Sequence, residues 1–288
     1  MKKLTFSLFV CLLFTPLLVA AKAEPVSLST KDGWTLSAIY SPAQAQRKTV
    51  ILLHDLNKKK EEFTTFSNDL AKAGIGYLAV DLRGHGRSTG RGHVSGFAKE
   101  GVDNPFNKMT YDAEAAVSFL KSKGVAADQI VLLGAGLGAQ IAAKSAVLSG
   151  VNAVALISPS ANIRDVLVIP SIRLYKGDVL IGASAGDKKG FLEASVIRNV
   201  AFLTTGEGKV TFLTAYDFSS HELLDRYLRP SLVQWIKTPH KPDLAPDTHT
   251  FAASSGLAPA GLVTDTNGIP VGSSSTEEAL VPSVLGGL

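Results

Sequence analysis

The sequence predicts an α/β protein with a mostly parallel central sheet that is flanked by helices, and two observations predict it. First, strand-like and helical segments alternate along the chain after an opening pair of β-rich runs, 26–30 and 34–40. Second, strand-like runs such as 49–54 and 153–157 are apolar almost throughout. Such uninterrupted apolar runs are typical of strands buried on both faces of a parallel sheet, and alternation with helices favours parallel pairing.

The elements follow one another in a regular order. The two opening runs are joined by Lys31-Asp32-Gly33, and Asp-Gly is a strong hairpin signal. The connection from Ile157 to Val179 has only about 20 residues, too few for a large cap domain. We expect the later strands at 49–54, 76–80, 130–133, 153–157, 179–183 and 210–213, and helices at 59–73, 110–123, 138–148, 194–203 and 223–236.

Residues 1–23 have the features of a secretory signal. A short basic start precedes an apolar run, 4–20, and a small-x-small cleavage site follows at 21–23. We expect cleavage after Ala23 and no stable membrane span afterwards. An uncleaved membrane anchor is the alternative, because the run approaches the ~20 residues that cross a bilayer. Pro16 and the cleavage site favour removal.

Cysteine content and charge narrow the class of protein further. Cys11 is the only cysteine and lies in the predicted signal, so the exported chain would hold neither a disulfide nor a free thiol, and the absence of a free thiol suits an oxidising periplasmic or extracellular location. The chain has 29 Lys and Arg and 25 Asp and Glu residues, and loss of Lys2, Lys3 and Lys22 with the signal leaves 26 basic residues. A net charge so close to zero does not support nucleic-acid binding.

The rest of the chain divides near Thr238. With 45% hydrophobic residues, the chain can build one substantial core, which we assign to residues 24–238. From 239 to 288 the composition shifts to Pro, Ala, Ser, Gly and Thr without a sustained period. We therefore predict a flexible tail there rather than a second domain.

The strongest functional signal is an apolar strand that turns abruptly into a helix at Gly134-Ala-Gly-Leu-Gly138. This turn resembles the G-x-S-x-G elbow of the α/β-hydrolase superfamily, which holds a nucleophilic serine on a strained turn. Residues 81–88, Asp-Leu-Arg-Gly-His-Gly-Arg-Ser, are similar to the D-x-R-G-H-G-x-S signature of the same superfamily. Gly136 stands at the serine position, so the resemblance implies an α/β-hydrolase fold without its nucleophile.

The resemblance also implies an acid and a histidine. Asp187 follows the strand at 179–183, where the superfamily keeps its triad acid, and His221 follows the last strand, where it keeps its histidine. In a complete triad the imidazole takes the proton of the nucleophile and the acid orients the imidazole. Here Asp187 and His221 are expected to form a dyad beside Gly136.

Backbone N–H groups that stabilise an oxyanion complete such a site. One comes from the residue after the nucleophile, which is Leu137, and the other from the loop His54-Asp55-Leu56. We expect Leu137 and Asp55 as the donors, with His54 beside them. Many members of the superfamily carry His-Gly at the start of this loop, and a carboxylate at Asp55 would repel a developing oxyanion.

Other interpretations are weaker. Residues 134–139 also fit G-x-G-x-x-A, a dinucleotide-binding pattern, but the strand at 153–157 ends in Ser-Pro with no acid to hold a ribose. We expect no cofactor, and the histidines lack metal-binding spacing. Residues 58–62 are interpreted as a solvated helix start, and Arg83 and His85 as structural.

Two hypotheses for function remain. In the first, the chain is an exported pseudohydrolase that binds a small ester, amide or lipidic ligand, or a protein partner, in the former active-site cleft. In the second, it is a weak or unconventional esterase or peptidase in which His221, oriented by Asp187, activates water.

Overall fold

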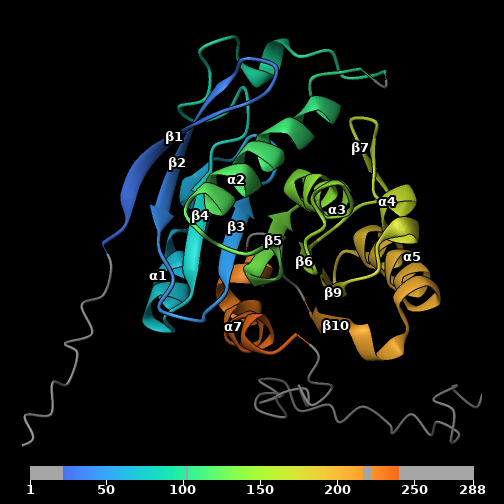
Figure 1. Ribbon diagram of the computed structural model, residues 1–288. Helices are drawn as coiled ribbons and strands as arrows, with labels where there is room; N and C mark the ends of the chain where they lie inside the picture. The colour runs from blue at the N-terminus through green and yellow to red at the C-terminus, as the bar shows by residue number, and fades with distance from the viewer. Residues whose placement is uncertain (1–21, 102, 217–221, 240–288) are drawn as a thin grey trace, which may run out of the picture. The chain divides into compact units, whose positions relative to one another are not determined.

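The computed structural model describes residues 22–101, 103–216 and 222–239. The chain divides into two units, 1–244 and 245–288, and every described residue lies in the first. Its framework is an eight-stranded sheet in the order β1-β2-β4-β3-β5-β6-β9-β10 (Figure 1). β1 and β2 are antiparallel, β2 and β4 are antiparallel, and all other neighbours are parallel. This confirms the predicted mostly parallel α/β sheet.

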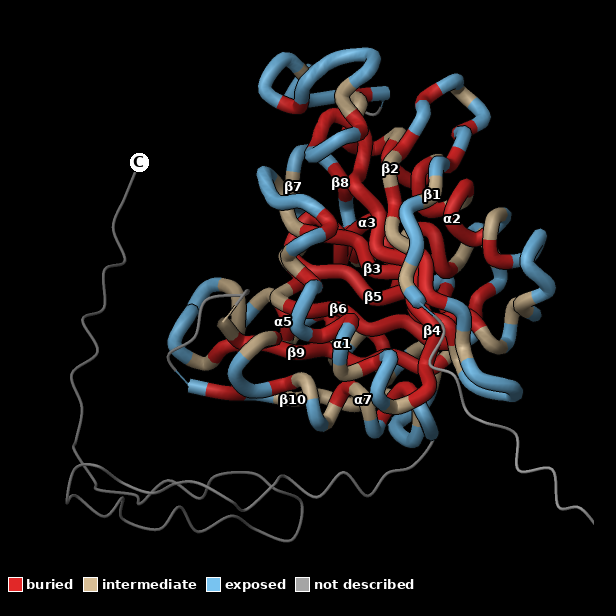
Figure 2. Tube along the Cα trace, turned by 90° about the vertical axis from the view of Figure 1, so that its left-hand side faces the viewer, coloured by how far each residue is buried: buried red, intermediate tan, exposed pale blue. Residues whose placement is uncertain are grey.

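The strands lie close to their predicted positions. Their bounds are β1 Glu24–Ser29, β2 Thr35–Ser41, β3 Thr49–Leu53, β4 Gly76–Val80, β5 Ile130–Ala135, β6 Ala153–Ile157, β9 Asp178–Ser184 and β10 Val210–Ala215. β3, β4, β5, β6 and β9 are buried along their whole length, as Figure 2 shows for the centre of the sheet. Burial on both faces explains why the sequences of these strands are apolar without interruption.

Helices cover both faces of the sheet. The longer ones are α1 Thr64–Lys72, α2 Thr110–Ser122, α3 Leu137–Ser149, α5 Lys188–Thr205 and α7 Arg229–Lys237. α2, α3 and α5 pack on one face, and α1 and α7 pack on the other (Figure 1). Phe66 of α1 and Trp235 of α7 are fully buried. Removing each aromatic side chain from water contributes roughly 1.5 to 3 kcal/mol or more.

The connection between β6 and β9 is small, as predicted. It holds a two-stranded hairpin, β7 Asn162–Ile163 and β8 Val166–Leu167, and the six-residue helix α4 Ile169–Leu174. It carries no large cap domain over the sheet.

Two helix predictions were imprecise. The helix expected at 194–203 begins at Lys188, because Asp187 caps it by accepting the N–H of Gly190 at 3.0 Å. The final helix is not uniform: residues Leu223–Leu228 form a π-helix before α7 begins at Arg229. Pro230 lies in the first turn of α7, and a proline cannot donate the backbone hydrogen bond that would continue the preceding helix.

Candidate functional site

The turn between β5 and α3 keeps the shape of a nucleophile elbow. Gly136 has φ 50° and ψ −117°, a conformation that L-residues rarely adopt. A Cβ at Gly134 would lie 2.0 Å from the backbone oxygen of Gly138, and a Cβ at Gly138 would lie 2.0 Å from that of Leu53. The outer glycines are therefore required by the close approach of α3 to the sheet.

The carboxylate of Asp55 lies where a nucleophile side chain would stand. A Cβ built on Gly136 would lie 1.9 Å from Asp55 Oδ1 and 2.1 Å from its Cγ. These distances are far below van der Waals contact, so the elbow in this arrangement accommodates only glycine. The sequence placed Asp55 near the site but did not indicate that its side chain fills the position of the missing serine.

Two backbone N–H groups converge on that carboxylate. Leu137 donates its N–H to Asp55 Oδ1 at 2.8 Å, and Leu56 donates its N–H to the same oxygen at 2.6 Å. Two N–H donors aimed at one oxygen are the arrangement that stabilises an oxyanion in acyl transfer. We refer to these two N–H groups as the oxyanion hole; its occupant is the side chain of Asp55.

One expected donor is replaced by its neighbour. We expected the N–H of Asp55 to point into the hole, but that N–H is donated to Glu62 Oε2 at 2.9 Å. The N–H of Leu56 takes its place beside that of Leu137. The sequence carried no signal for Glu62, because the contact depends on how η1, Lys60–Phe63, folds back against the loop.

The loop that carries Asp55 is held by several further contacts. The carbonyl oxygen of Asp55 accepts the N–H of Lys58 at 3.0 Å and a hydrogen bond from His54 Nδ1 at 2.8 Å. Asn57 adopts a positive φ of 60° and donates its N–H to His85 Nε2 at 3.2 Å. The carboxylate is thus presented from a loop that is fixed on both sides.

Both ring nitrogens of His54 form hydrogen bonds with the backbone around the loop. His54 is fully buried, and Nε2 accepts the N–H of Leu82 at 3.0 Å while Nδ1 donates to Asp55. Burial lowers the pKa of His54 to about 4. Both ring nitrogens are used within the fold, so His54 contributes to the site by positioning Asp55.

The predicted signature at 81–88 is a buried polar cluster. Asp81 accepts hydrogen bonds from Lys60 Nζ at 2.5 Å, from the Lys60 N–H at 2.9 Å and from the Arg87 N–H at 2.9 Å. Burial opposes ionisation of Asp81, but these hydrogen bonds outweigh it and lower its pKa. The interpretation of 58–62 as a solvated helix start is wrong for Lys60, which is only 6% exposed because Asp81 neutralises it.

Arg83 has the expected structural role. Its guanidinium contacts Asp112 of α2 at 2.7 Å and Asp32 of the β1–β2 turn at 2.6 Å. It also lies over the rings of Trp34 and Tyr111. Arg83 therefore ties the loop after β4 to the hairpin and to α2.

The proposed acid and histidine are not brought together by the described residues. Asp187 lies just after β9, two strands from β5, and its side chain is exposed apart from the contact with Gly190. His221 lies outside the described residues. The dyad stays a prediction.

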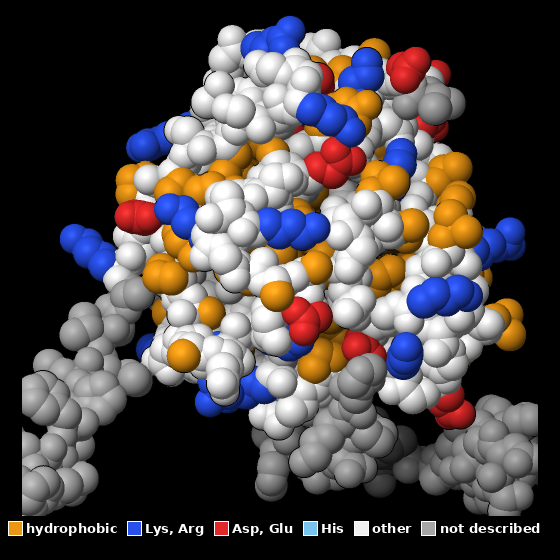
Figure 3. Space-filling view, viewed as in Figure 1, with side chains coloured by type: hydrophobic (Ala, Val, Ile, Leu, Met, Phe, Trp, Pro, Cys, Tyr) orange, Lys and Arg blue, Asp and Glu red, His pale blue; other side chains and the backbone are white. Residues whose placement is uncertain are grey.

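A pocket of about 530 Å³ lies beside the loop of Asp55. Its lining includes Lys58, Glu62 and His85, so its charge is mixed, and Glu62 also accepts the N–H of Asp55. On the face shown in Figure 3, basic and acidic side chains are likewise interspersed. Within the described ranges, no group of three or more His, Cys, Asp or Glu residues could hold a metal ion, and no helix is long and apolar enough to cross a membrane.

One family sequence model matches the part of the chain that contains the elbow. The sequence model of the family described as "Serine aminopeptidase, S33" matches residues 44–181. This range contains the Asp55 loop, the 81–88 signature and the elbow, and it ends before Asp187. A search of curated protein sequences found no significant match.

Solved structures with the same architecture include several hydrolases. An esterase of Pyrococcus furiosus is 17% identical, with a TM-score of 0.62 over 77% of this chain and 94% of that one. An esterase of Exiguobacterium antarcticum is 15% identical, with a TM-score of 0.57 over 75% and 100%. An α-β serine hydrolase homologue from Coxiella burnetii is 19% identical, with a TM-score of 0.56 over 73% and 96%. Identities this low establish a shared fold.

Proposed function

We propose that this chain, which has the α/β-hydrolase fold and carries glycine at its elbow, is an exported pseudohydrolase that binds a ligand or a protein partner at the former active-site cleft. The ligand class is a small ester, amide or lipid. The observation that carries the proposal is the occupied oxyanion hole, in which Leu137 and Leu56 both donate to the carboxylate of Asp55.

Two independent effects oppose acyl transfer in this arrangement. Removing the nucleophile of a serine hydrolase lowers turnover by about a millionfold. In addition, the negative charge of Asp55 would repel an oxyanion formed beside it. Two such charges 4 Å apart repel by about 4 kcal/mol at an effective dielectric constant of 20. The hole would have to lose its present occupant before it could stabilise a reaction intermediate.

The arrangement is also favourable for the fold. A non-glycine residue in the strained conformation of Gly136 costs roughly 1 to 3 kcal/mol, and glycine avoids that cost. The carboxylate of Asp55 satisfies two N–H groups that would otherwise need water or a ligand. Stability therefore favours the pair Gly136 and Asp55 once catalysis is no longer required.

The test is hydrolysis of a short activated ester, p-nitrophenyl butyrate, by protein purified after expression of the full chain. Wild type and Gly136→Ser should both be inactive, because a side chain at Gly136 would collide with Asp55. The double variant Gly136→Ser with Asp55→Gly should gain turnover, since it opens the hole and supplies a hydroxyl. The matched control is Gly136→Ala with Asp55→Gly, which lacks the hydroxyl and should stay inactive.

The same assay separates the proposal from its rival. Turnover by the wild type that disappears in His221→Ala would overturn the pseudohydrolase and assign water activation to His221. Activity in the Ala control equal to that of the Ser variant would also overturn the proposed nucleophile replacement, because no hydroxyl would then be involved.

A further inference from the structure

The edge of the sheet opposite the candidate site carries exposed leucines and several basic residues. β3, β4, β5, β6, β9 and β10 all begin there, since neighbouring parallel strands start at the same edge. We call it the amino edge. Gly136 and Asp55 follow the ends of β5 and β3 and therefore lie at the other edge.

Three of the five exposed leucines among the described residues lie at the amino edge, whereas Leu167 of β8 and Leu192 near the start of α5 lie towards the other edge. Leu148, Leu174 and Leu203 are 60%, 67% and 88% exposed. Each lies at or near the last residue of a helix, α3, α4 or α5, that leads back to a strand start. The ends of α4 and α5 are joined, because Lys176 Nζ donates to the backbone oxygen of Thr204 at 3.0 Å. The three leucines thus belong to adjoining helix ends.

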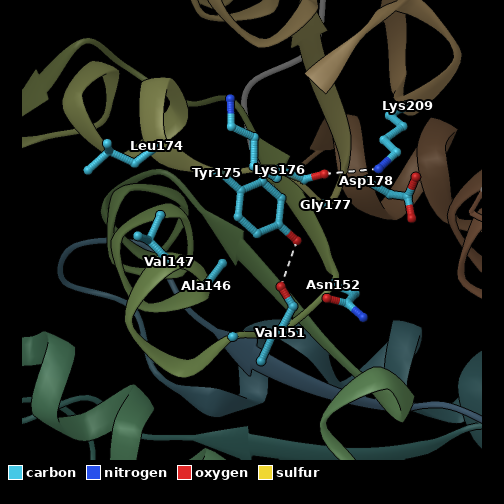
Figure 4. Close-up of a pocket in the computed structure, with 11 residues that line it drawn as sticks. Ala146, Val147, Val151, Asn152, Leu174, Tyr175, Lys176, Gly177, Asp178 and Lys209 are labelled. Atoms are coloured by element: carbon cyan, nitrogen blue, oxygen red, sulfur yellow. Dashed lines mark hydrogen bonds between the residues drawn. The ribbon is translucent and has the colours of Figure 1, made fainter. Parts of the chain in front are cut away.

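A shallow pocket lies among these helix ends. It has a volume of about 380 Å³, and Val147 and Leu174 line it together with Lys176 and Lys209 (Figure 4). Lys209 Nζ donates to the backbone oxygen of Lys176 at 3.1 Å, which keeps the two lysines beside the apolar wall. Apolar side chains and ammonium groups therefore share one surface.

Basic residues predominate along the loops that enter the strands at this edge. Counting the helix ends as well as the loops, the exposed or half-buried charges there are basic at seven positions and acidic at three, Glu24, Asp128 and Glu207, and the buried Asp178 also lines the pocket. The basic ones are Arg47, Lys48, Lys72, Lys121, Lys123, Lys176 and Lys209. Since 26 basic and 25 acidic residues follow the predicted signal, this excess is a local property of the edge.

The N-terminal segment joins the domain at the same edge. β1 is antiparallel to β2, and β2 is antiparallel to β4, so β1 begins at Glu24 on the side where β4 begins. The apolar run 4–20 precedes Glu24 in the sequence.

We propose that the amino edge is a contact face for an anionic lipid surface, with Leu148, Leu174 and Leu203 entering the interface and the surrounding lysines near lipid phosphates. Exposed apolar side chains ringed by cations bind such surfaces, because apolar burial and electrostatic attraction add. This face is distant from the oxyanion hole, and the proposal does not depend on the pseudohydrolase function.

The test is co-sedimentation of the purified full-chain product with vesicles. We expect binding to vesicles that contain phosphatidylglycerol, little binding to pure phosphatidylcholine, and weakening by salt. Lys121→Gln with Lys123→Gln should reduce binding about 25-fold, at about fivefold for each lysine near the surface. Leu174→Ser with Leu203→Ser should reduce it about tenfold through lost apolar burial.

Matched controls lie at the opposite edge. Lys58→Gln with Lys59→Gln, and Leu167→Ser in β8, remove the same kinds of side chain and should leave vesicle binding unchanged. Equal losses in these controls, or equal binding to phosphatidylcholine, would overturn the proposal. A dimer that forms without vesicles, and that Leu174→Ser with Leu203→Ser abolishes, would also overturn the proposal, because the face would then bind a second copy of the chain.

Discussion

At the residue scale, Asp55 determines what the site beside Gly136 can bind. Its Oδ1 atom accepts the N–H groups of Leu56 and Leu137, and hydrogen bonds to an ionised acceptor are stronger than those between neutral groups. The carboxylate belongs to the same chain, so an external anion competes against an occupant that is always present. The hole is therefore an anion site that is closed by its own loop.

Removing that side chain should open the anion site. In Asp55→Ala the N–H groups of Leu56 and Leu137 lose their acceptor, and acetate, a carboxylate of similar size, can take its place. If acetate binds with a Kd of about 10 mM, 100 mM acetate adds about 1.4 kcal/mol of stability. Thermal unfolding in acetate and in chloride at equal ionic strength should show a Tm rise of a few degrees in Asp55→Ala and none in the wild type. A rise of equal size in both proteins would contradict the occupied hole.

His54 makes stability depend on pH. Burial lowers its pKa from 6.5 to about 4, so the unfolded chain binds the proton more readily. The contribution of the neutral ring is complete above pH 6.5 and is lost as the pH falls towards 4, a change of about 3 kcal/mol. Urea unfolding at pH 7 and pH 4 should show this loss as a difference between the wild type and His54→Asn, because the buried Asp112, whose pKa is raised to about 6, contributes in the opposite direction in both proteins. His54→Asn should be less stable at pH 7 but should depend less on pH; an unchanged slope would contradict the assignment.

At the scale of elements, the start of α5 has two competing explanations. The sequence predicts that Asp187 forms a dyad with His221, whereas the structure shows Asp187 capping α5 through the N–H of Gly190. A cap of this kind stabilises a protein by typically about 1 kcal/mol. The cap explains why α5 begins at Lys188 even though Gly190 lies in its first turn.

Two substitutions separate the cap from the acid. Asp187→Ala should lower the free energy of unfolding by about 1 kcal/mol, because the N–H of Gly190 loses its acceptor. Asp187→Asn keeps an acceptor and should be nearly as stable as the wild type, although it removes the charge that a triad would need. Denaturant unfolding measures both. A large loss of stability in Asp187→Asn would show that the charge, rather than the cap, holds this end of α5.

At the scale of the whole molecule, the two edges of the sheet have different properties. The edge where β3 and β5 end carries Gly136 and the loop of Asp55. The opposite edge carries exposed leucines, an excess of lysines and the start of β1. A parallel sheet makes this separation possible, because all the loops after strands lie on one side and all the loops before strands lie on the other.

Export makes a direct prediction about the N-terminus. If residues 1–23 are removed, intact-mass analysis of the full chain expressed in a bacterium with a secretion pathway should show Glu24 as the first residue. Ala23→Leu should block cleavage, since the signal site requires a small residue there. A wild-type product that retains the apolar run 4–20 would instead support the anchor.

The sequence alone determined the class of fold and the order of its elements. Apolar strand runs, the Asp32-Gly33 turn and the glycines of the elbow are local signals, and each depends on a few neighbouring residues. For the same reason the sequence predicts that Gly136 stands at the position of a nucleophile and that the loop of Asp55 lies beside it. It could not show which atoms of that loop enter the oxyanion hole.

Only the tertiary structure decided the state of the site. Asp55 and Leu137 are 82 positions apart, and their hydrogen bond exists because β3 and β5 are neighbours in the sheet. The burial of Lys60 against Asp81 and the contact of Glu62 with Asp55 also depend on packing between distant segments. Composition and spacing show which chemical groups the chain contains. The contact between a carboxylate and two N–H groups forms only when the chain folds.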